Sequence, residues 1–175
     1  MKRQLNSFEL LEERFMEDSK TEKNSHMPKI VVPIFNETPW ELPSYATPQS
    51  SGFDVRANIK EQIVLKPGER QLIPTGIYLQ LPPLLEAQVR PRSGLANKHG
   101  ISIVNTPGTV DADYRGQIHV NLINLGKEDF MVEPGAKIAQ VVIVPIYQVC
   151  WEPVASKEEL EETERGTQGH GHSGV

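Results

Sequence analysis

Two short segments of this sequence combine chemically active side chains with residues that form turns. In one, Asp111 lies between Gly108 and Tyr114, where a carboxylate could orient a water molecule and take its proton. In the other, Arg92 and Ser93 follow a proline and precede a glycine, so that a hydroxyl and backbone N–H groups could face an anion. Plainer explanations exist for both, because aspartate is common in turns and arginine in surface ion pairs. On the residues alone, a turn aspartate is the favoured interpretation of the first segment.

A third segment, at the end of the chain, joins an arginine to a run of glycines. Arg165 is followed by four glycines within residues 166–175. Glycine lets a backbone follow a phosphate chain closely, but a segment of this composition cannot pack a core by itself. It is therefore either a disordered end or a lid that becomes ordered over a ligand.

The elements that must position these residues are expected to be short β-strands. All 14 prolines lie between Pro28 and Pro153, and the longest span there without Pro or Gly is 53–66, which leaves little room for long helices. Apolar and polar residues alternate over 118–122, which is the period of a strand. Apolar runs of strand length occupy 30–35, 76–81 and 138–144. This pattern predicts an all-β fold, either a sandwich, a jelly roll or a barrel.

Composition divides the 175 residues into a lead segment 1–27, a core 28–153 and a tail 154–175. The net charge is −5, yet residues 28–156 hold 11 basic and 12 acidic side chains, so most of the acidity lies outside the core. This balance argues against nucleic-acid binding through a global basic field. The apolar residues of the lead segment recur at helical spacing, which fits a short amphipathic helix as well as a poorly ordered extension. Ser25-His26-Met27 resembles a cloning remnant, with Met27 as a candidate native start.

The single cysteine, Cys150, rules out an internal disulfide and a cysteine-based zinc ribbon. We expect it to be a buried or interface thiol, because nothing near it favours a nucleophile. No apolar run is long enough to span a bilayer, and no basic-then-apolar signal peptide is found. The expected location is therefore cytoplasmic, or nuclear in a eukaryote.

Five separated segments resemble, in order, the five motifs of the homotrimeric dUTP pyrophosphatases (dUTPases). They are Ser51–Ala57 (SGFDVRA), Arg90–Ala96 (RPRSGLA), Asn105–Gly116 (NTPGTVDADYRG), Gly135–Gln140 (GAKIAQ) and Arg165–Gly174 (RGTQGHGHSG). A lone Arg-Ser-Gly is weak evidence, whereas the third segment is specific by itself. The resemblance implies a homotrimeric jelly roll, or distorted β-barrel, with active sites shared between subunits. It also implies hydrolysis of dUTP to dUMP and pyrophosphate, which limits uracil incorporation into DNA and supplies dUMP for dTMP synthesis.

The resemblance assigns the third segment to the nucleoside and to the chemistry. Asp111 would activate the water that attacks the α-phosphorus. Tyr114 would pack against the deoxyribose and leave no room for a 2′-hydroxyl. Asn105 would read the uracil edge, because an amide offers both a donor and an acceptor, and backbone groups near Gly108 and Val110 would share that work.

The same resemblance assigns residues of the other segments to the triphosphate. Ser93 and Gly94 would lie at the bridge between the α- and β-phosphates, with Arg92 in a supporting charge role. Gln140 would contact the phosphates from the fourth segment. Arg165 would supply a guanidinium to the γ-phosphate in the manner of an arginine finger, and the tail is then a lid that reaches another subunit's site.

The implied cofactor is Mg²⁺. Asp54, expected at the beginning of a strand, would lie near the ion through coordinating waters, since Mg²⁺ keeps several waters and takes further ligands from substrate phosphates. The ion would neutralise charge and orient the triphosphate. Asp113 is a weaker candidate, because a structural salt bridge explains it equally well.

The lid departs from the family pattern. His170 stands where the family has a phenylalanine that stacks on uracil, Gln168 replaces a glycine and His172 replaces a small residue. The implied nucleotide contacts of the lid are Gly169 and His170. Histidine can stack, but it is smaller and more polar, and it gains a charge near a pH of about 6.5. We expect weaker stacking and a pH-dependent lid, whereas a metal site at the two histidines is disfavoured for want of fixed geometry.

Two other functions are kept as alternatives. A related deaminase that acts on dCTP shares the jelly roll, but the intact 110–116 segment and the glycine-rich tail favour the hydrolase. Release of ammonia from dCTP would reverse that choice. A nonenzymatic binding module, in which the trimer or the lead segment recruits a partner, gains some support from residues 1–27. The substitution Asp111→Asn separates it from an enzyme, since an enzyme should lose turnover and keep nucleotide binding.

Overall fold

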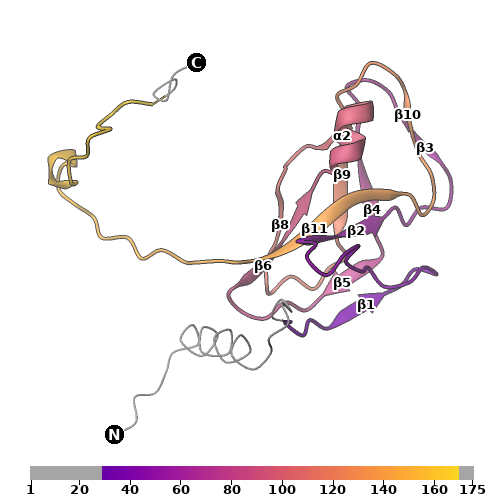
Figure 1. The fold of residues 1–175 in the computed structure, drawn as a ribbon, viewed down its shortest axis with the longest axis horizontal. Coiled ribbons are helices and arrows are strands. Elements are labelled where there is room, and N and C mark those ends of the chain that lie inside the picture. Colours follow the sequence, from indigo (N-terminus) through magenta and orange to yellow (C-terminus); the bar gives the residue numbers. More distant parts are fainter. Residues whose placement is uncertain (1–28, 170–175) are drawn as a thin grey trace, which may run out of the picture.

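A computed structural model describes residues 29–169, and almost all of its regular structure is β (Figure 1). The strands are β1 (Ile34–Asn36), β2 (Gly52–Arg56), β3 (Ile63–Leu65), β4 (Arg70–Pro74), β5 (Ile77–Leu79), β6 (Leu85–Arg90), β7 (Ile101–Ile103), β8 (Gly108–Val110), β9 (His119–Asn124), β10 (Phe130–Val132) and β11 (Lys137–Pro145). The helices are α2 (Ser93–His99) and the 3₁₀ turn η1 (Lys157–Glu159). The all-β prediction is confirmed. The expected helix of the lead segment lies outside the described residues.

The strands pair in antiparallel fashion in four groups. The largest sheet has the order β2-β11-β6-β8, and a second sheet has the order β4-β9-β7. Two ribbons, β1-β5 and β10-β3, complete the body. Because β11 lies between β2 and β6, segments far apart in the sequence become neighbours across this strand.

Burial along the strands follows the expected period of two. In β9, Val120, Leu122 and Asn124 are buried, while the residues between them are less so. In β6, alternate apolar residues face the core, which leaves the polar side chains of the strand, among them Gln88 and Arg90, for the opposite face. The core therefore lies between the sheets, and the outer face of the large sheet carries the polar side chains of β6 beside Val142 and Val144 of β11.

Two local predictions were wrong. Arg92-Ser93 was expected in a turn, but Ser93 begins α2, because the five residues after Gly94 contain neither proline nor glycine and can form a helix. The helix ends at Gly100, whose left-handed backbone (φ 68°) lets its N–H bond back to carbonyls of the last turn. Asp54 was expected to begin a strand, but it lies in the middle of β2.

After β11 the chain leaves the body as an extended arm (Figure 1). Tyr147, Val149 and Trp151 are 75, 66 and 83% exposed, at alternate positions of this arm. Cys150 is exposed as well. It is therefore not buried within its own chain, and its expected place at an interface stays a prediction. Among the described residues, no helix is long and apolar enough to cross a membrane.

Candidate active site

Strand register builds the first part of the site. Gln140 of β11 is paired with Asp54 of β2 on one side and with Arg90 of β6 on the other. Residues that are direct partners across antiparallel strands have side chains on the same face of the sheet. Two predicted site residues, 86 positions apart in the sequence, thus lie in one row.

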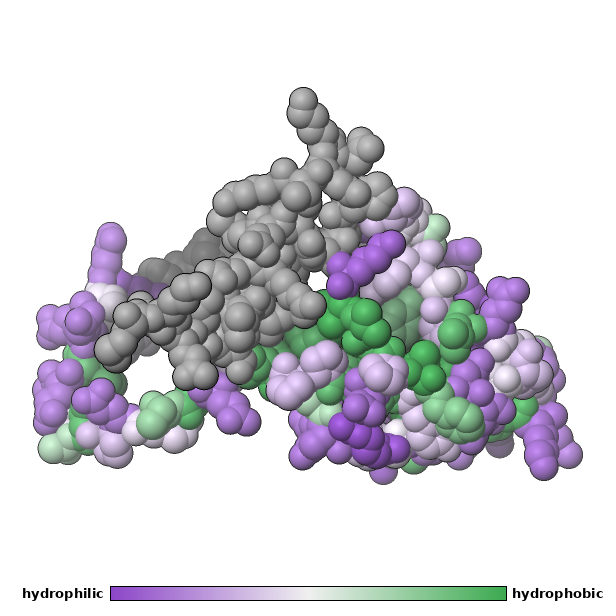
Figure 2. Space-filling view, turned by 90° about the horizontal axis from the view of Figure 1, so that it is seen from below, coloured by the Kyte–Doolittle hydropathy of each residue, from purple (hydrophilic) through white to green (hydrophobic). Residues whose placement is uncertain are grey.

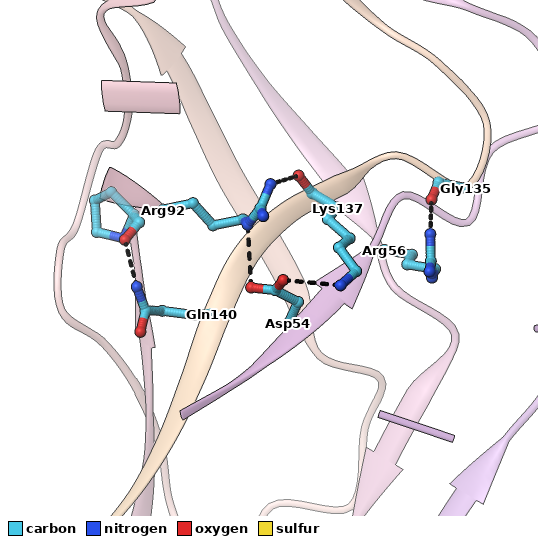
Figure 3. A network of polar contacts seen from close by, with 7 residues as sticks. Asp54, Arg56, Arg92, Gly135, Lys137 and Gln140 are labelled. Atoms are coloured by element: carbon cyan, nitrogen blue, oxygen red, sulfur yellow. Dashed lines mark hydrogen bonds and ion pairs between the residues drawn. The ribbon is translucent and has the colours of Figure 1, made fainter. Parts of the chain in front are cut away.

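Asp54 is held between two cations, as Figure 3 shows. The Nε of Arg92 donates to Oδ1 of Asp54 at 3.0 Å, and Nζ of Lys137 lies 3.2 Å from Oδ2. A second nitrogen of Arg92, Nη1, donates to the backbone carbonyl of Lys137 at 3.1 Å. These contacts fix the guanidinium at the end of β6. Lys137 was not predicted as a site residue, although it lies in the same short segment as Gln140.

The start of α2 lies beside this row. The amide of Gln140 donates to the carbonyl of Pro91 at 3.2 Å, which ties β11 to the segment that enters the helix (Figure 3). Ser93 and Gly94 are exposed in the first turn of α2. The first N–H groups of a helix have no partner within it and favour negative charge. A Cβ added at Gly94 would meet no atom within 4 Å, so the space in front of this turn is open.

The polar side chains around Asp54 suit a metal ion that binds together with the phosphates of a ligand. No cluster of three or more His, Cys, Asp or Glu side chains that could hold a metal exists within residues 29–169. Both oxygens of Asp54 already face cations. Residues 29–169 therefore offer Mg²⁺ no cage of their own, and the contact of Asp54 with the water shell of an ion stays a prediction.

The second part of the site lies on the two loops beside β8. Asn105, in the loop before β8, lies over Gly108, since a Cβ added at that buried glycine would be 3.4 Å from the amide nitrogen of Asn105. A side-chain amide and the backbone of β8 are thus brought together, as the reading of a base edge requires. Val110, the last residue of β8, is half-buried and packs against the core.

The loop after β8 presents a carboxylate and an aromatic ring. Asp111 is exposed, and its side chain has no hydrogen-bond or ion-pair partner within the described part of the chain. Its backbone carbonyl accepts a bond from the N–H of Tyr114 at 3.1 Å, which closes a turn. The ring of Tyr114 folds back over Gly116 and is 45% exposed, and its hydroxyl donates to the carbonyl of Gln117 at 3.1 Å.

The two parts lie on opposite sides of β6, with β11 on one side and β8 on the other. No hydrogen bond or ion pair among residues 29–169 joins Asp111 or Tyr114 to Asp54, Arg92 or Gln140. Arg165 lies in the arm, where its Nε donates to the carbonyl of Gln168 at 2.9 Å. Gly169, the last described residue, is exposed. His170 and His172 lie outside the described residues, so the expected pH-dependent lid stays a prediction.

Comparisons with known proteins agree with the five segments. The sequence pattern that defines the dUTPase family matches residues 38–174. The deoxyuridine 5′-triphosphate nucleotidohydrolase of Chlamydia pneumoniae is 56% identical over 135 residues, which cover 77% of this chain and 92% of that protein. The enzyme of the same name from Maricaulis maris (strain MCS10) is 53% identical over 153 residues, which cover 86% and 99% of the two chains.

Solved structures show the same fold. The dUTPase of Staphylococcus bacteriophage 80alpha, solved with dUPNHPP, superposes with a TM-score of 0.73 at 25% identity, and the match covers 84% of this chain and all of that one. A mutant dUTPase of phage phi11 of S. aureus, described as showing the coordination of a structural Mg(II) ion, has a TM-score of 0.65 at 22% identity over 74% of this chain and 99% of that one. From its sequence pattern and its relatives, the chain belongs to the dUTPase family.

Proposed function

We propose that this chain hydrolyses dUTP to dUMP and pyrophosphate, as a homotrimer whose active sites take residues from more than one subunit. Relatives that are 53–56% identical are named as nucleotidohydrolases of this substrate. The observation that carries the proposal is the turn after β8, where the unpaired carboxylate of Asp111 stands three residues from the exposed ring of Tyr114. This arrangement supports a role for Asp111 as the base for water and for Tyr114 as a flat surface for the sugar.

In the proposed reaction Asp111 accepts a proton from the water that attacks the α-phosphorus. An exposed carboxylate without an internal partner is free to bind that water. Tyr114 packs against the deoxyribose, and Asn105 with the backbone at Gly108 and Val110 binds the uracil edge. An added 2′-hydroxyl would meet the ring of Tyr114, so ribonucleotides are rejected.

The triphosphate binds to the first part of the site. The hydroxyl of Ser93 and the free N–H groups of Ser93 and Gly94 face the α/β bridge, and the amide of Gln140 reaches the same chain of phosphates. The guanidinium of Arg92, held by Asp54, adds positive charge without contacting the reacting atoms. Arg165 and Gly169 come from the arm, with His170 beyond them.

Mg²⁺, when bound, neutralises part of the charge on the triphosphate. Asp54 would hold the ion through its water shell, while Arg92 and Lys137 keep this carboxylate in place. The same local charges compensate for a chain whose net charge of −5 would otherwise repel the substrate.

Assembly is supported by apolar surface that one chain leaves uncovered. Val31 and Phe35 are exposed beside the β1-β5 ribbon, and Figure 2, seen from below, shows apolar side chains gathered at the surface of the body. The arm adds alternate exposed residues, which is the pattern of a strand that lacks a sheet. Addition of the arm to a neighbouring copy would bury these residues and carry Arg165 toward another subunit's site.

The test of the chemistry is a pair of matched substitutions in one loop. Asp111→Asn should reduce pyrophosphate release from dUTP at least about 100-fold, while the affinity for a nonhydrolysable dUTP analogue changes by less than about threefold. Asp113→Asn, an exposed carboxylate two residues away, is the control and should stay active. Equal losses in both variants would contradict the role of Asp111. Ammonia released from dCTP by the wild type would favour the deaminase instead.

The test of shared sites is complementation between two inactive chains. Asp111→Asn and Arg92→Ala each disable a different part of the site. When the two chains are unfolded, mixed and refolded together, about a quarter of the sites should combine two intact parts, and activity should return. If each site were built from one chain, the mixture would stay inactive.

A further inference from the structure

A carboxylate outside the five segments organises a network behind the Tyr114 turn. Glu37, just after β1, accepts a hydrogen bond from Nε2 of Gln117 at 2.8 Å on Oε1 and one from the hydroxyl of Tyr78 at 3.1 Å on Oε2. Nε2 of Gln117 also donates to the Tyr78 hydroxyl at 3.0 Å. Nδ2 of Asn58 adds a longer bond to Oε1 of Glu37, at 3.3 Å. One carboxylate thus binds three donors from three other parts of the chain.

The amide of Gln117 is oriented from both ends. Its Oε1 accepts the backbone N–H of Gly76 at 3.2 Å, while its nitrogen faces the carboxylate of Glu37. Because an amide has an acceptor at one end and donors at the other, only one orientation satisfies both partners. Glu37 is itself fixed by a bond from its N–H to the carbonyl of Gly76, at 3.0 Å.

Gly76 permits this close packing. Its backbone is left-handed (φ +70°), and an added Cβ would lie 2.3 Å from Cγ2 of Thr38 and 3.1 Å from Cγ of Glu37. A side chain at this position would force the Glu37 segment away. The position of Glu37 is therefore set by the fold and not by the active-site turn.

The network ends at the ring that faces the sugar in the proposed function. The backbone carbonyl of Gln117 accepts the hydroxyl of Tyr114 at 3.1 Å and faces Nδ1 of His119 at 2.9 Å, which must carry a hydrogen to bond there. Gln117 thus holds Glu37 with its side chain and Tyr114 with its main chain. Displacement of the side chain would displace the acceptor of the Tyr114 hydroxyl.

We propose that Glu37 is a positioning residue for sugar selection: through Gln117 it holds the Tyr114 ring where a 2′-hydroxyl would clash. This inference rests on the proposed function, because it names what sets the discrimination of that site. Glu37 contacts neither the substrate nor Asp111, so its effect should fall on the choice between dUTP and UTP and not on the chemical step.

The experiment compares kcat/KM for dUTP and UTP, by pyrophosphate release, in the full-length protein. Glu37→Ala should lower the ratio of the two values about fivefold to tenfold, the loss expected for one ordinary, solvent-exposed hydrogen bond. The kcat for dUTP should stay within about threefold of the wild type. Glu37→Gln keeps one acceptor for Gln117 and should recover part of the ratio. Glu61→Ala, which removes an exposed carboxylate in the loop between β2 and β3, should leave it unchanged.

A double-mutant cycle separates positioning from general destabilisation. Tyr114→Phe removes the hydroxyl that bonds to Gln117. If Glu37 acts through this bond, Glu37→Ala should lower the ratio far less in the Tyr114→Phe background than in the wild type. Additive effects, an unchanged ratio, or equal losses for both nucleotides would each overturn the proposal. A wild type that does not hydrolyse dUTP would instead overturn the proposed function.

Discussion

Gly116 offers a way to move the Tyr114 ring without touching the ring itself. A Cβ at this position would lie 2.3 Å from the Tyr114 hydroxyl oxygen and 2.4 Å from Cζ. Ordinary contacts of a Cβ begin at 3.4 Å, so in Gly116→Ala the ring must retreat by about 1 Å. The ring is half-exposed, so it can swing toward solvent. Its 3.1 Å bond to the carbonyl of Gln117 is then lost.

The stability cost of this change should be small. Loss of one hydrogen bond costs about 1 kcal/mol, and replacement of glycine by alanine restricts the unfolded chain by about 0.4–1 kcal/mol in the opposite direction. The unfolding free energy of Gly116→Ala should therefore stay within about 1 kcal/mol of the wild type. The selectivity for dUTP over UTP should change more, because a site that fits its substrate rejects an added hydroxyl by roughly 100-fold. We expect the preference for dUTP over UTP to fall about tenfold or more.

The assay is the ratio of kcat/KM values for dUTP and UTP, with urea unfolding of each variant beside it. Gly94→Ala is the matched control, since its added Cβ meets nothing within 4 Å and lies on the phosphate side, which both nucleotides share. It should leave the ratio unchanged, whatever it does to the rates. If Gly116→Ala kept the full preference for dUTP, the ring would not be the barrier. If it lost several kcal/mol of stability, the ring would be packed more firmly than its exposure indicates.

Three further predictions concern the core, the metal and the assembly. Asn124 is fully buried and its amide makes three hydrogen bonds, of 2.7, 2.8 and 2.9 Å, so Asn124→Ala should lower the unfolding free energy by about 2–4 kcal/mol in urea titrations. Asp54→Asn removes two partly exposed ion pairs, which are worth at most about 1 kcal/mol each. It should nevertheless raise the Mg²⁺ concentration that gives half-maximal activity. If that concentration were unchanged, the role of Asp54 would be limited to holding Arg92. Trp151→Ala should shift the proposed trimer toward smaller species in sedimentation at micromolar concentration, because a large apolar side chain would no longer contribute to the proposed interface.

The sequence allowed the residues of the site to be named but not their arrangement. Alternation over β9 and the order of the five segments were enough to predict strands and family, because both are local signals. The pairing of Lys137 with Asp54 could not be predicted, since it depends on which strand lies beside β2. The proposed role of Glu37 could not be predicted either, because its hydrogen-bond partner Gln117 is 80 residues away in the sequence.

The two wrong local predictions have different causes. Proline and glycine around Ser93 indicated a turn, but the helix-forming residues that follow outweigh the glycine in its first turn. Asp54 lies in the middle of β2, where the strand register places it opposite Gln140 and its side chain reaches Arg92. Spacing alone carries no information on such directions.

The arm has a consequence for how the enzyme acquires activity. Every fully buried apolar residue of the described chain lies between Val55 and Val142, so the core can form before the arm has a partner. In the proposed trimer, folding and activation are then separate events, the first within one chain and the second between chains. During refolding, protection of the core should appear at a rate that is independent of protein concentration, and turnover of dUTP should follow later, in a phase that accelerates as the concentration rises. A dilute cell extract would hold chains that are fully folded and catalytically silent.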